Sequence, residues 1–231
     1  MRYLSRNKVY QKIDADRTAK KIYIFCEGAE TEIKYFKYFQ GFSSNIDIIP
    51  IPNINGQSDP LKLRENAELL FLGDEFNPPK LLFSEEYKDE VWFVIDTDRW
   101  NESDKIKLLK AFCDTKNISR KQWFVAQSNP CFELWLYYHF YVIRPETSLV
   151  VEYASFKDFV NYVIAGGFDP RKMPIEIENA IMNSKSNFQT ENNQPALYST
   201  EVHLLGDVIV PFIKTQLDKA KEMMSSNTGA S

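Results

Sequence analysis

Four short runs of consecutive apolar residues mark expected strands in the first part of the chain. In the clearest run, VWFVI at residues 91–95, five apolar residues lead directly into an acidic turn. Strands that are apolar on both faces are typical of parallel sheets covered by helices above and below. Two prolines in the second run place that strand at an edge of the sheet or end it early. The predicted strands cover residues 21–28, 46–54, 91–100 and 122–128.

Segments with helical periodicity follow each of these strands. In residues 31–41, Ile33, Phe36 and Phe39 recur at every third position before Gly41 ends the segment. The further predicted helices cover residues 61–73, 105–116 and 129–143. This alternation predicts an α/β fold in which a mostly parallel, Rossmann-like sheet is flanked by helices.

The pattern changes after Ile143, where polar turns separate shorter helical segments. A stretch rich in Asn and Gln, residues 187–201, is expected to be mobile. The helical segments after this change cover residues 155–167, 175–186 and 202–217. The sequence thus predicts a basic N-terminal arm (1–20), an α/β core (21–143), a mainly helical C-terminal part packed on the core (144–223) and a disordered tail (224–231).

Composition limits the classes of protein that fit. The 231 residues are 44% hydrophobic and 14% aromatic, which indicates a folded protein with a substantial core. No apolar run is long enough to cross a membrane, and the polar, basic start of the chain does not resemble a signal peptide. We therefore expect a cytoplasmic protein. Three cysteines without a CxxC pair and only two histidines argue against a disulfide framework or a zinc site.

Acidic residues stand at the ends of two predicted strands. Glu27 follows the first, and Asp96 and Asp98 follow the strand at residues 91–100. Sites in open α/β sheets form at the carboxyl ends of strands, and clustered carboxylates suit Mg²⁺ or Mn²⁺. Each acid taken singly could instead belong to an exposed turn or cap a helix. Their combination on two strands favours a metal site.

Glu133 is the only formally charged residue in the apolar segment at residues 130–143. A buried carboxylate without a partner is costly, so it could serve the same site, or it could complement the helix dipole from the first turn. His139, on another face of the expected helix, is interpreted as a core residue. The motifs of P-loop, dinucleotide-binding and hydrolase-elbow sites are absent from the sequence.

Three motifs carry a resemblance to a known family. CEGAETEIKYF (26–36), VIDTDRW (94–100) and SNPCFELWLYYHF (128–140) resemble, in order and spacing, segments of RloB-like proteins, a bacterial family found near restriction and phage-defence genes. YSTEVHLLGDVI (198–209) resembles the C-terminal segment of the family more loosely. The resemblance covers roughly residues 20–210.

RloB-like proteins are in turn similar to Toprim domains, which carry a glutamate after the first strand and a DxD after a later one around Mg²⁺. The resemblance implies that Glu27 is the first of these acids and that Asp96 and Asp98 are the DxD. It also places Glu32 as the second acid of the first motif and Glu133 as the acid on the later helix. Glu27 and Glu32 are five residues apart here, against four in many Toprim nucleases.

The activity implied is that of a Toprim-like endonuclease in prokaryotic anti-phage defence, dependent on Mg²⁺ or Mn²⁺, that hydrolyses phosphodiester bonds in RNA, including tRNA, or in DNA. Lys34 and Arg99 lie beside the acids and are candidates to contact phosphate, or else solvated surface charges. The alternative is a catalytically inactive sensor subunit that binds nucleic acid or a partner and works with an ATPase. Nucleic acid is the expected partner, together with an ATPase or a further copy of the chain.

Overall fold

The computed structural model describes residues 12–53, 59–97, 104–118 and 120–228. The strands are β1 (Lys20–Cys26), β2 (Ile46–Ile51), β3 (Glu90–Asp96), β4 (Trp123–Asn129), β5 (Thr190–Glu191), β6 (Gln194–Pro195) and β7 (Ser199–Thr200). The helices are α1 (Thr31–Lys37), α2 (Pro60–Leu72), α3 (Lys105–Lys116), α4 (Glu133–Tyr137), α5 (Thr147–Val150), α6 (Phe156–Val163), the 3₁₀ helix η2 (Met173–Glu176), α7 (Ile177–Ser186) and α8 (Val202–Thr228).

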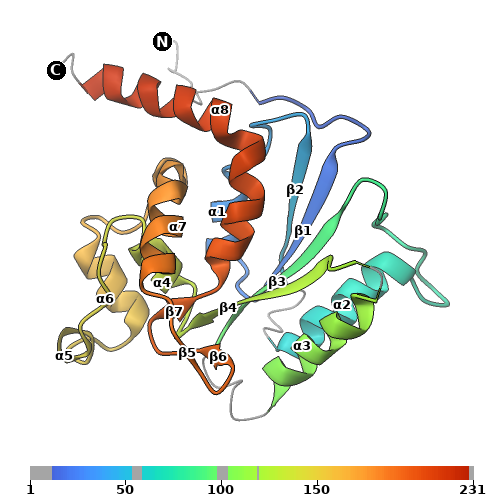
Figure 1. Cartoon of the computed structure of the whole chain (residues 1–231), viewed down its shortest axis with the longest axis horizontal. Coiled ribbons are helices and arrows are strands. Elements are labelled where there is room, and N and C mark those ends of the chain that lie inside the picture. Colours follow the sequence, from blue (N-terminus) through green and yellow to red (C-terminus); the bar gives the residue numbers. More distant parts are fainter. Residues whose placement is uncertain (1–11, 54–58, 98–103, 119, 229–231) are drawn as a thin grey trace.

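The main sheet has five strands in the order β2-β1-β3-β4-β7 (Figure 1). The first four run parallel, and β7 pairs antiparallel with β4. The predicted α/β class with a mostly parallel sheet is therefore confirmed, and β2, with its prolines, lies at an edge as expected. Because the chain moves from β1 outward to β2 and then back across to β3, the order reverses between β1 and β3. Ligands bind at such a switch point in open α/β sheets.

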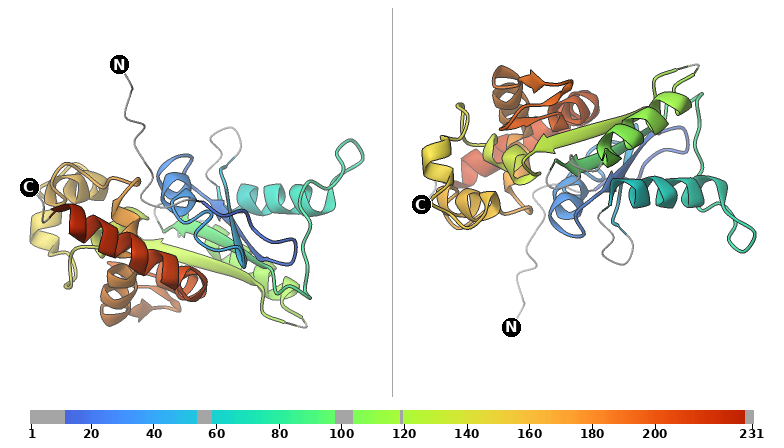
Figure 2. Two further views of the ribbon diagram at one scale, coloured as in Figure 1. Left: turned by 90° about the horizontal axis from the view of Figure 1, so that it is seen from above. Right: turned by 90° about the horizontal axis from the view of Figure 1, so that it is seen from below.

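Both faces of the sheet are buried, which explains why its strands are apolar at successive positions. On one face, Ile22 and Ile24 of β1 and Trp92 of β3 pack with α1, α7 and α8. On the other, Phe25 and Phe93 stack with ring centroids 5.4 Å apart beneath α2 and α3. Figures 1 and 2 show the sheet between these two layers of helices.

The C-terminal part shares its core with the α/β part. One face of α8 contributes Leu205, Ile209, Ile213 and Leu217 to the same hydrophobic cluster as β1 and β3. A separate cluster joins α4 to α6, where Phe159 packs against Tyr137 with ring centroids 6.0 Å apart. These contacts fix α6 relative to α4, which matters for the site below.

Three expectations about the C-terminal half were wrong in detail. The predicted helix at residues 129–143 is only five residues long, because Asn129 still belongs to β4 and the regular helix ends at Tyr137, with isolated turns after it. The Asn- and Gln-rich stretch contains the β5–β6 hairpin and β7. The helix α8 continues to Thr228, so residues 224–228 extend a helix where a disordered tail was expected; residues 229–231 lie outside the described part of the chain.

The described end of the N-terminal arm lies at the amino ends of the parallel strands. Ile13 donates its backbone N–H to the carbonyl of Gly41, and Asp16 donates to Ser44, so residues 12–19 follow the α1–β2 connection. Lys20 pairs with Glu90 at the start of β3. The predicted site lies at the carboxyl ends of the parallel strands. Residues 12–19 are therefore at the opposite end of the sheet from this site.

Among the residues that the structure describes, no helix is long and apolar enough to span a membrane.

Candidate acidic site at the carboxyl ends of the central strands

Glu27 and Asp96 lie side by side at the switch point of the sheet. Glu27 directly follows β1, Asp96 ends β3, and the two strands are paired in parallel. The N–H of Glu27 donates to the carbonyl of Val94 at 3.0 Å, which extends the strand pairing by one residue. The N–H of Asp96 donates to Oε2 of Glu27 at 2.9 Å. The two strand-end acids predicted from the sequence are thus brought together by the sheet itself.

Asp96 is held from a second direction by the segment leading into α4. Its Oδ1 accepts the backbone N–H of Phe132 at 2.8 Å. Burial raises the pKa of Asp96 well above its usual range, and the nearby carboxylates of Glu27, Glu32 and Glu133 raise it further, against the lowering effect of the Phe132 N–H. A buried carboxyl group whose pKa is raised by neighbouring carboxylates is typical of a functional site.

Glu32, in the first turn of α1, folds back over the β1–α1 turn. Its Oε1 accepts the N–H of Gly28 at 3.0 Å, and only 5% of the residue is exposed. A Cβ on Gly28 would lie 2.0 Å from Oε2 of Glu32, so any side chain at position 28 would require the Glu32 carboxylate to move. Burial raises the pKa of Glu32, and the charge of Glu133 adds to that rise. The larger spacing of Glu27 and Glu32 therefore still brings both acids to one place.

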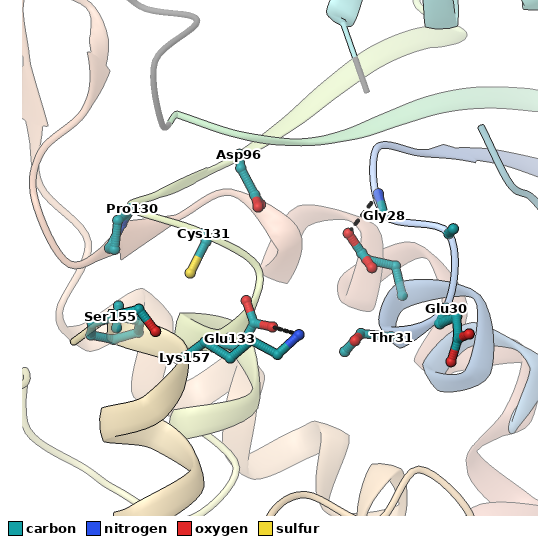
Figure 3. Close-up of a pocket in the computed structure, with 12 residues that line it drawn as sticks. Gly28, Glu30, Thr31, Asp96, Pro130, Cys131, Glu133, Ser155 and Lys157 are labelled. Atoms are coloured by element: carbon teal, nitrogen blue, oxygen red, sulfur yellow. Dashed lines mark hydrogen bonds and ion pairs between the residues drawn. The ribbon is translucent and has the colours of Figure 1, made fainter. Parts of the chain in front are cut away.

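Glu133 is the first residue of α4 and lines the same pocket as Asp96 and Glu32. The pocket has a volume of about 710 Å³. Figure 3 shows the side chains of Asp96 and Glu133 directed into it. The two interpretations of Glu133 thus coexist in the geometry: it sits in the first turn of a helix, and its carboxylate faces the acidic site.

The pocket is lined on its other sides by residues that the sequence did not indicate. Cys131 lies between Asp96 and Glu133. Burial raises the pKa of its thiol, and the charges of these two acids raise it further. The thiol is therefore poorly suited to act as a nucleophile. Ser155 and Lys157 reach the pocket from α6. The S-x-x-D pattern at Ser155 indicates a helix start, but no local signal reveals that α6 lies against α4.

Of the two predicted phosphate-contacting residues, the structure describes only Lys34, and Lys34 does not line the pocket. Lys34 is exposed and pairs with Glu30 at 2.5 Å on the surface of α1. Arg99 and the second acid of the DxD, Asp98, fall outside the described residues. Their roles stay predictions.

His139 is a core residue, as the sequence indicated. Its Nε2 lies 3.2 Å from the hydroxyl of Tyr35, and its Nδ1 lies 2.9 Å from the carbonyl of Trp135. Burial lowers the pKa of His139 to about 3, so it is neutral at physiological pH.

Thr97, the residue between the two DxD acids, is anchored by buried hydrogen bonds to β4. Its backbone N–H donates to the carbonyl of Ser128 at 2.7 Å, and its hydroxyl donates to the same carbonyl at 2.8 Å. The amide of Gln127 donates to the Thr97 hydroxyl at 2.9 Å. This buried network ties the end of β3 to β4 and fixes the direction in which Asp96 points.

We expect Thr97→Val to lower the free energy of unfolding by about 1–2 kcal/mol, because two buried hydrogen bonds are lost at constant shape. Urea denaturation measures this. The matched control is Thr115→Val on α3, an exposed threonine whose hydroxyl donates to Phe112, for which a change under about 0.5 kcal/mol is expected. Equal effects at the two positions would contradict an anchoring role for Thr97.

Oxygen donors dominate the site, which suits a hard divalent cation rather than zinc. Within residues 12–53, 59–97, 104–118 and 120–228, no three Asp, Glu, His or Cys side chains are arranged to hold one metal ion. Among the described residues, Asp96, Glu32 and Glu133 line the pocket, and Glu27 lies beside it, where its carboxylate accepts the N–H of Asp96. The donor chemistry fits the metal that the resemblance implies, and Asp98 lies outside the described residues.

Comparison with known proteins assigns the chain to a family. Searches among curated proteins and among solved structures find no match. A model of the RloB-like protein family matches residues 22–208, which include most of β1, the acidic pocket and the first turns of α8. The chain therefore belongs to the RloB-like protein family.

Proposed function

We propose that this protein is a divalent-metal-dependent endonuclease that hydrolyses phosphodiester bonds in RNA, tRNA included, or in DNA. The observation that carries the proposal is the convergence of Glu27 and Asp96 at the switch point, where burial and neighbouring carboxylates raise the pKa of Asp96. Several acids held this close repel one another unless a cation is present. A role in anti-phage defence rests on the family resemblance and stays a prediction.

The residues that would hold Mg²⁺ or Mn²⁺ are Glu27 and Asp96, with Glu133 and the predicted Asp98, and with Glu32 supporting from the β1–α1 turn. When bound, such an ion lowers the pKa of a coordinated water and stabilises negative charge on a scissile phosphate. The pocket of about 710 Å³ has room for a phosphate and one flanking nucleoside.

The backbone around the acids orients them in advance. The N–H of Phe132 fixes Asp96, the N–H of Asp96 fixes Glu27, and the N–H of Gly28 fixes Glu32. Each of these donors comes from an ordered strand end or turn. Preorganised carboxylates need little rearrangement when charge develops in the site, which is the main contribution that a protein makes to such catalysis.

The direct test is an assay of the purified protein on end-labelled total tRNA, single-stranded RNA and duplex DNA with Mg²⁺, with Mn²⁺, and with EDTA. We expect cleavage of at least one substrate with a divalent ion, none in EDTA, and none with Asp96→Ala. Cleavage by Asp96→Ala at the wild-type rate would assign the activity to a contaminant. Binding without cleavage under every condition would instead favour the inactive sensor subunit working with an ATPase.

A further inference from the structure

One positively charged side chain, which the sequence analysis did not identify, lines the acidic pocket. Of the described residues that line it, four are acidic, namely Glu30, Glu32, Asp96 and Glu133, and one, Lys157, is basic. Figure 3 shows the Lys157 side chain beside Glu133, with their ion pair marked by a dashed line. Lys157 is 61 residues away from Asp96 in the sequence, so only the fold brings the two together.

The position of Lys157 is set by a well-anchored helix. Ser155 caps α6 by accepting the N–H of Asp158 at 3.1 Å, while its hydroxyl donates to the Asp158 carboxylate at 2.7 Å. Two turns of α6 are fixed by Phe159 and Val160, which are buried against α4. Lys157 is therefore delivered to the pocket by a helix that cannot easily move away from it.

The ion pair between Lys157 and Glu133 is asymmetric. Lys157 Nζ lies 3.4 Å from Glu133 Oε1, and the exposed fraction is 60% for the lysine side chain but 13% for the glutamate side chain. Separation of this pair leaves the ammonium group hydrated, and it leaves the carboxylate in the acidic pocket. Because the ammonium group is already largely exposed to solvent while the pair is intact, an incoming cation can replace it at small cost.

We propose that Lys157 has two roles: it is the resident counter-ion of the acidic pocket, and it contacts a substrate phosphate once a divalent cation takes its place beside Glu133. This inference rests on the proposed function. A polyanion approaching four acids needs a local cation, because the chain carries a net charge of −4. The first-turn N–H groups of α6 lie at the same wall and add partial positive charge to that of Lys157.

The two roles predict opposite effects of one substitution. Lys157→Ala removes a competitor for Glu133, so the affinity for Mn²⁺ should rise about two- to fivefold. The same substitution removes a phosphate contact, so affinity for nucleic acid should fall, and the slope of log K against log salt should decrease by about 0.7 for single strands or 0.9 for a duplex. A merely structural role for Lys157 would lower both affinities.

The experiment uses the full chain and needs no turnover. Mn²⁺ is titrated calorimetrically into wild type and Lys157→Ala. Binding of a labelled RNA of about 20 nucleotides, and of a DNA duplex of the same sequence, is then measured in Ca²⁺ over a range of NaCl concentrations. The matched control is Lys185→Ala, which removes one exposed lysine that pairs with Asp207 away from the pocket, and which should change neither affinity beyond the common loss of one charge.

Tighter Mn²⁺ binding together with a reduced salt slope in Lys157→Ala alone supports the proposal. Unchanged Mn²⁺ affinity, or a salt slope equal to that of Lys185→Ala, overturns it, as does failure of the wild type to bind Mn²⁺ or either nucleic acid. Metal and nucleic-acid binding that respond to Lys157 without any cleavage would overturn the proposed nuclease activity and leave this inference standing.

Discussion

Replacing Asp96 with Asn should abolish cleavage and, at the same time, raise the free energy of unfolding of the metal-free protein by roughly 1–2 kcal/mol near pH 8. Asn keeps an oxygen to accept the N–H of Phe132, and it removes a buried negative charge from the neighbourhood of Glu27, Glu32 and Glu133. The charge that the proposed reaction needs is therefore a charge that the folded chain tolerates poorly. Loss of cleavage of about a thousandfold or more is expected.

The difference in free energy of unfolding between Asp96→Asn and the wild type should depend on pH. Burial raises the pKa of Asp96 in the folded protein above its value of about 3.9 in an unfolded chain, so the folded state holds the proton more tightly. The stability of the wild type should fall as pH rises from about 4 through the raised pKa, and the advantage of Asp96→Asn should grow over that same window. Below pH 4 the advantage should vanish. Added Mg²⁺ should stabilise the wild type and not the variant.

Urea denaturation between pH 4 and pH 9 measures both curves. The matched control is Asp169→Asn, because the pKa of Asp169 is lowered to about 2 by its hydrogen bonds and ion pair with Arg171. That variant should be destabilised by a nearly constant amount from about pH 5 to pH 9, because the stabilising effect of Asp169 is lost only as pH falls from about 4 towards 2. The advantage of Asp96→Asn should instead grow over the measured range and has the opposite sign. If Asp96→Asn lost stability at pH 8 as Asp169→Asn does, Asp96 would be a structural acid.

The four parallel strands were predictable because each has apolar residues on both faces, whereas β7, which consists of Ser199 and Thr200, has no such pattern. The unbroken apolar run at residues 91–95 favoured a parallel strand covered by helices on both faces. In the structure these residues do pack against helices on both sides of the sheet. The length of α4 was not predictable in this way. The aromatic run after Glu133 correctly indicates burial, but burial of Tyr138 and His139 is achieved in turns beyond the helix.

The acids of the candidate site were predictable for a topological reason. The carboxyl ends of neighbouring parallel strands meet at one edge, so Glu27 and Asp96 had to lie near each other once β1 and β3 were adjacent. The other wall of the pocket depends on the packing of α6 against α4 through Phe159 and Tyr137, which no local pattern encodes. For that reason the sequence pointed to Lys34, whereas the structure brings Lys157 to the acids.

Gly28→Ala should destabilise the protein by about 1–3 kcal/mol, although alanine usually favours ordered backbone. The added methyl group would lie 2.0 Å from Oε2 and 2.4 Å from Oε1 of Glu32. The carboxylate cannot remain where it is, and its displacement also breaks the 3.0 Å hydrogen bond from the Gly28 N–H. Glu32 lines the acidic pocket with Asp96 and Glu133, so a displaced carboxylate would move among these like charges.

A double-mutant cycle isolates this contact from every other effect of the two substitutions. In a Glu32→Ala background the methyl group of Gly28→Ala meets no carboxylate, so its cost should fall by about 1–3 kcal/mol. In a Glu32→Gln background, which keeps the size of the side chain, the cost should remain. Denaturation of the single and double variants supplies both numbers. If Gly28→Ala is equally costly with Ala and with Gln at position 32, the glycine is required by the backbone of the β1–α1 turn. If its cost disappears only with Ala at position 32, glycine is required at position 28 because the carboxylate of Glu32 occupies the space of a side chain. The first motif is then a single unit that places Glu27 and Glu32 beside Asp96.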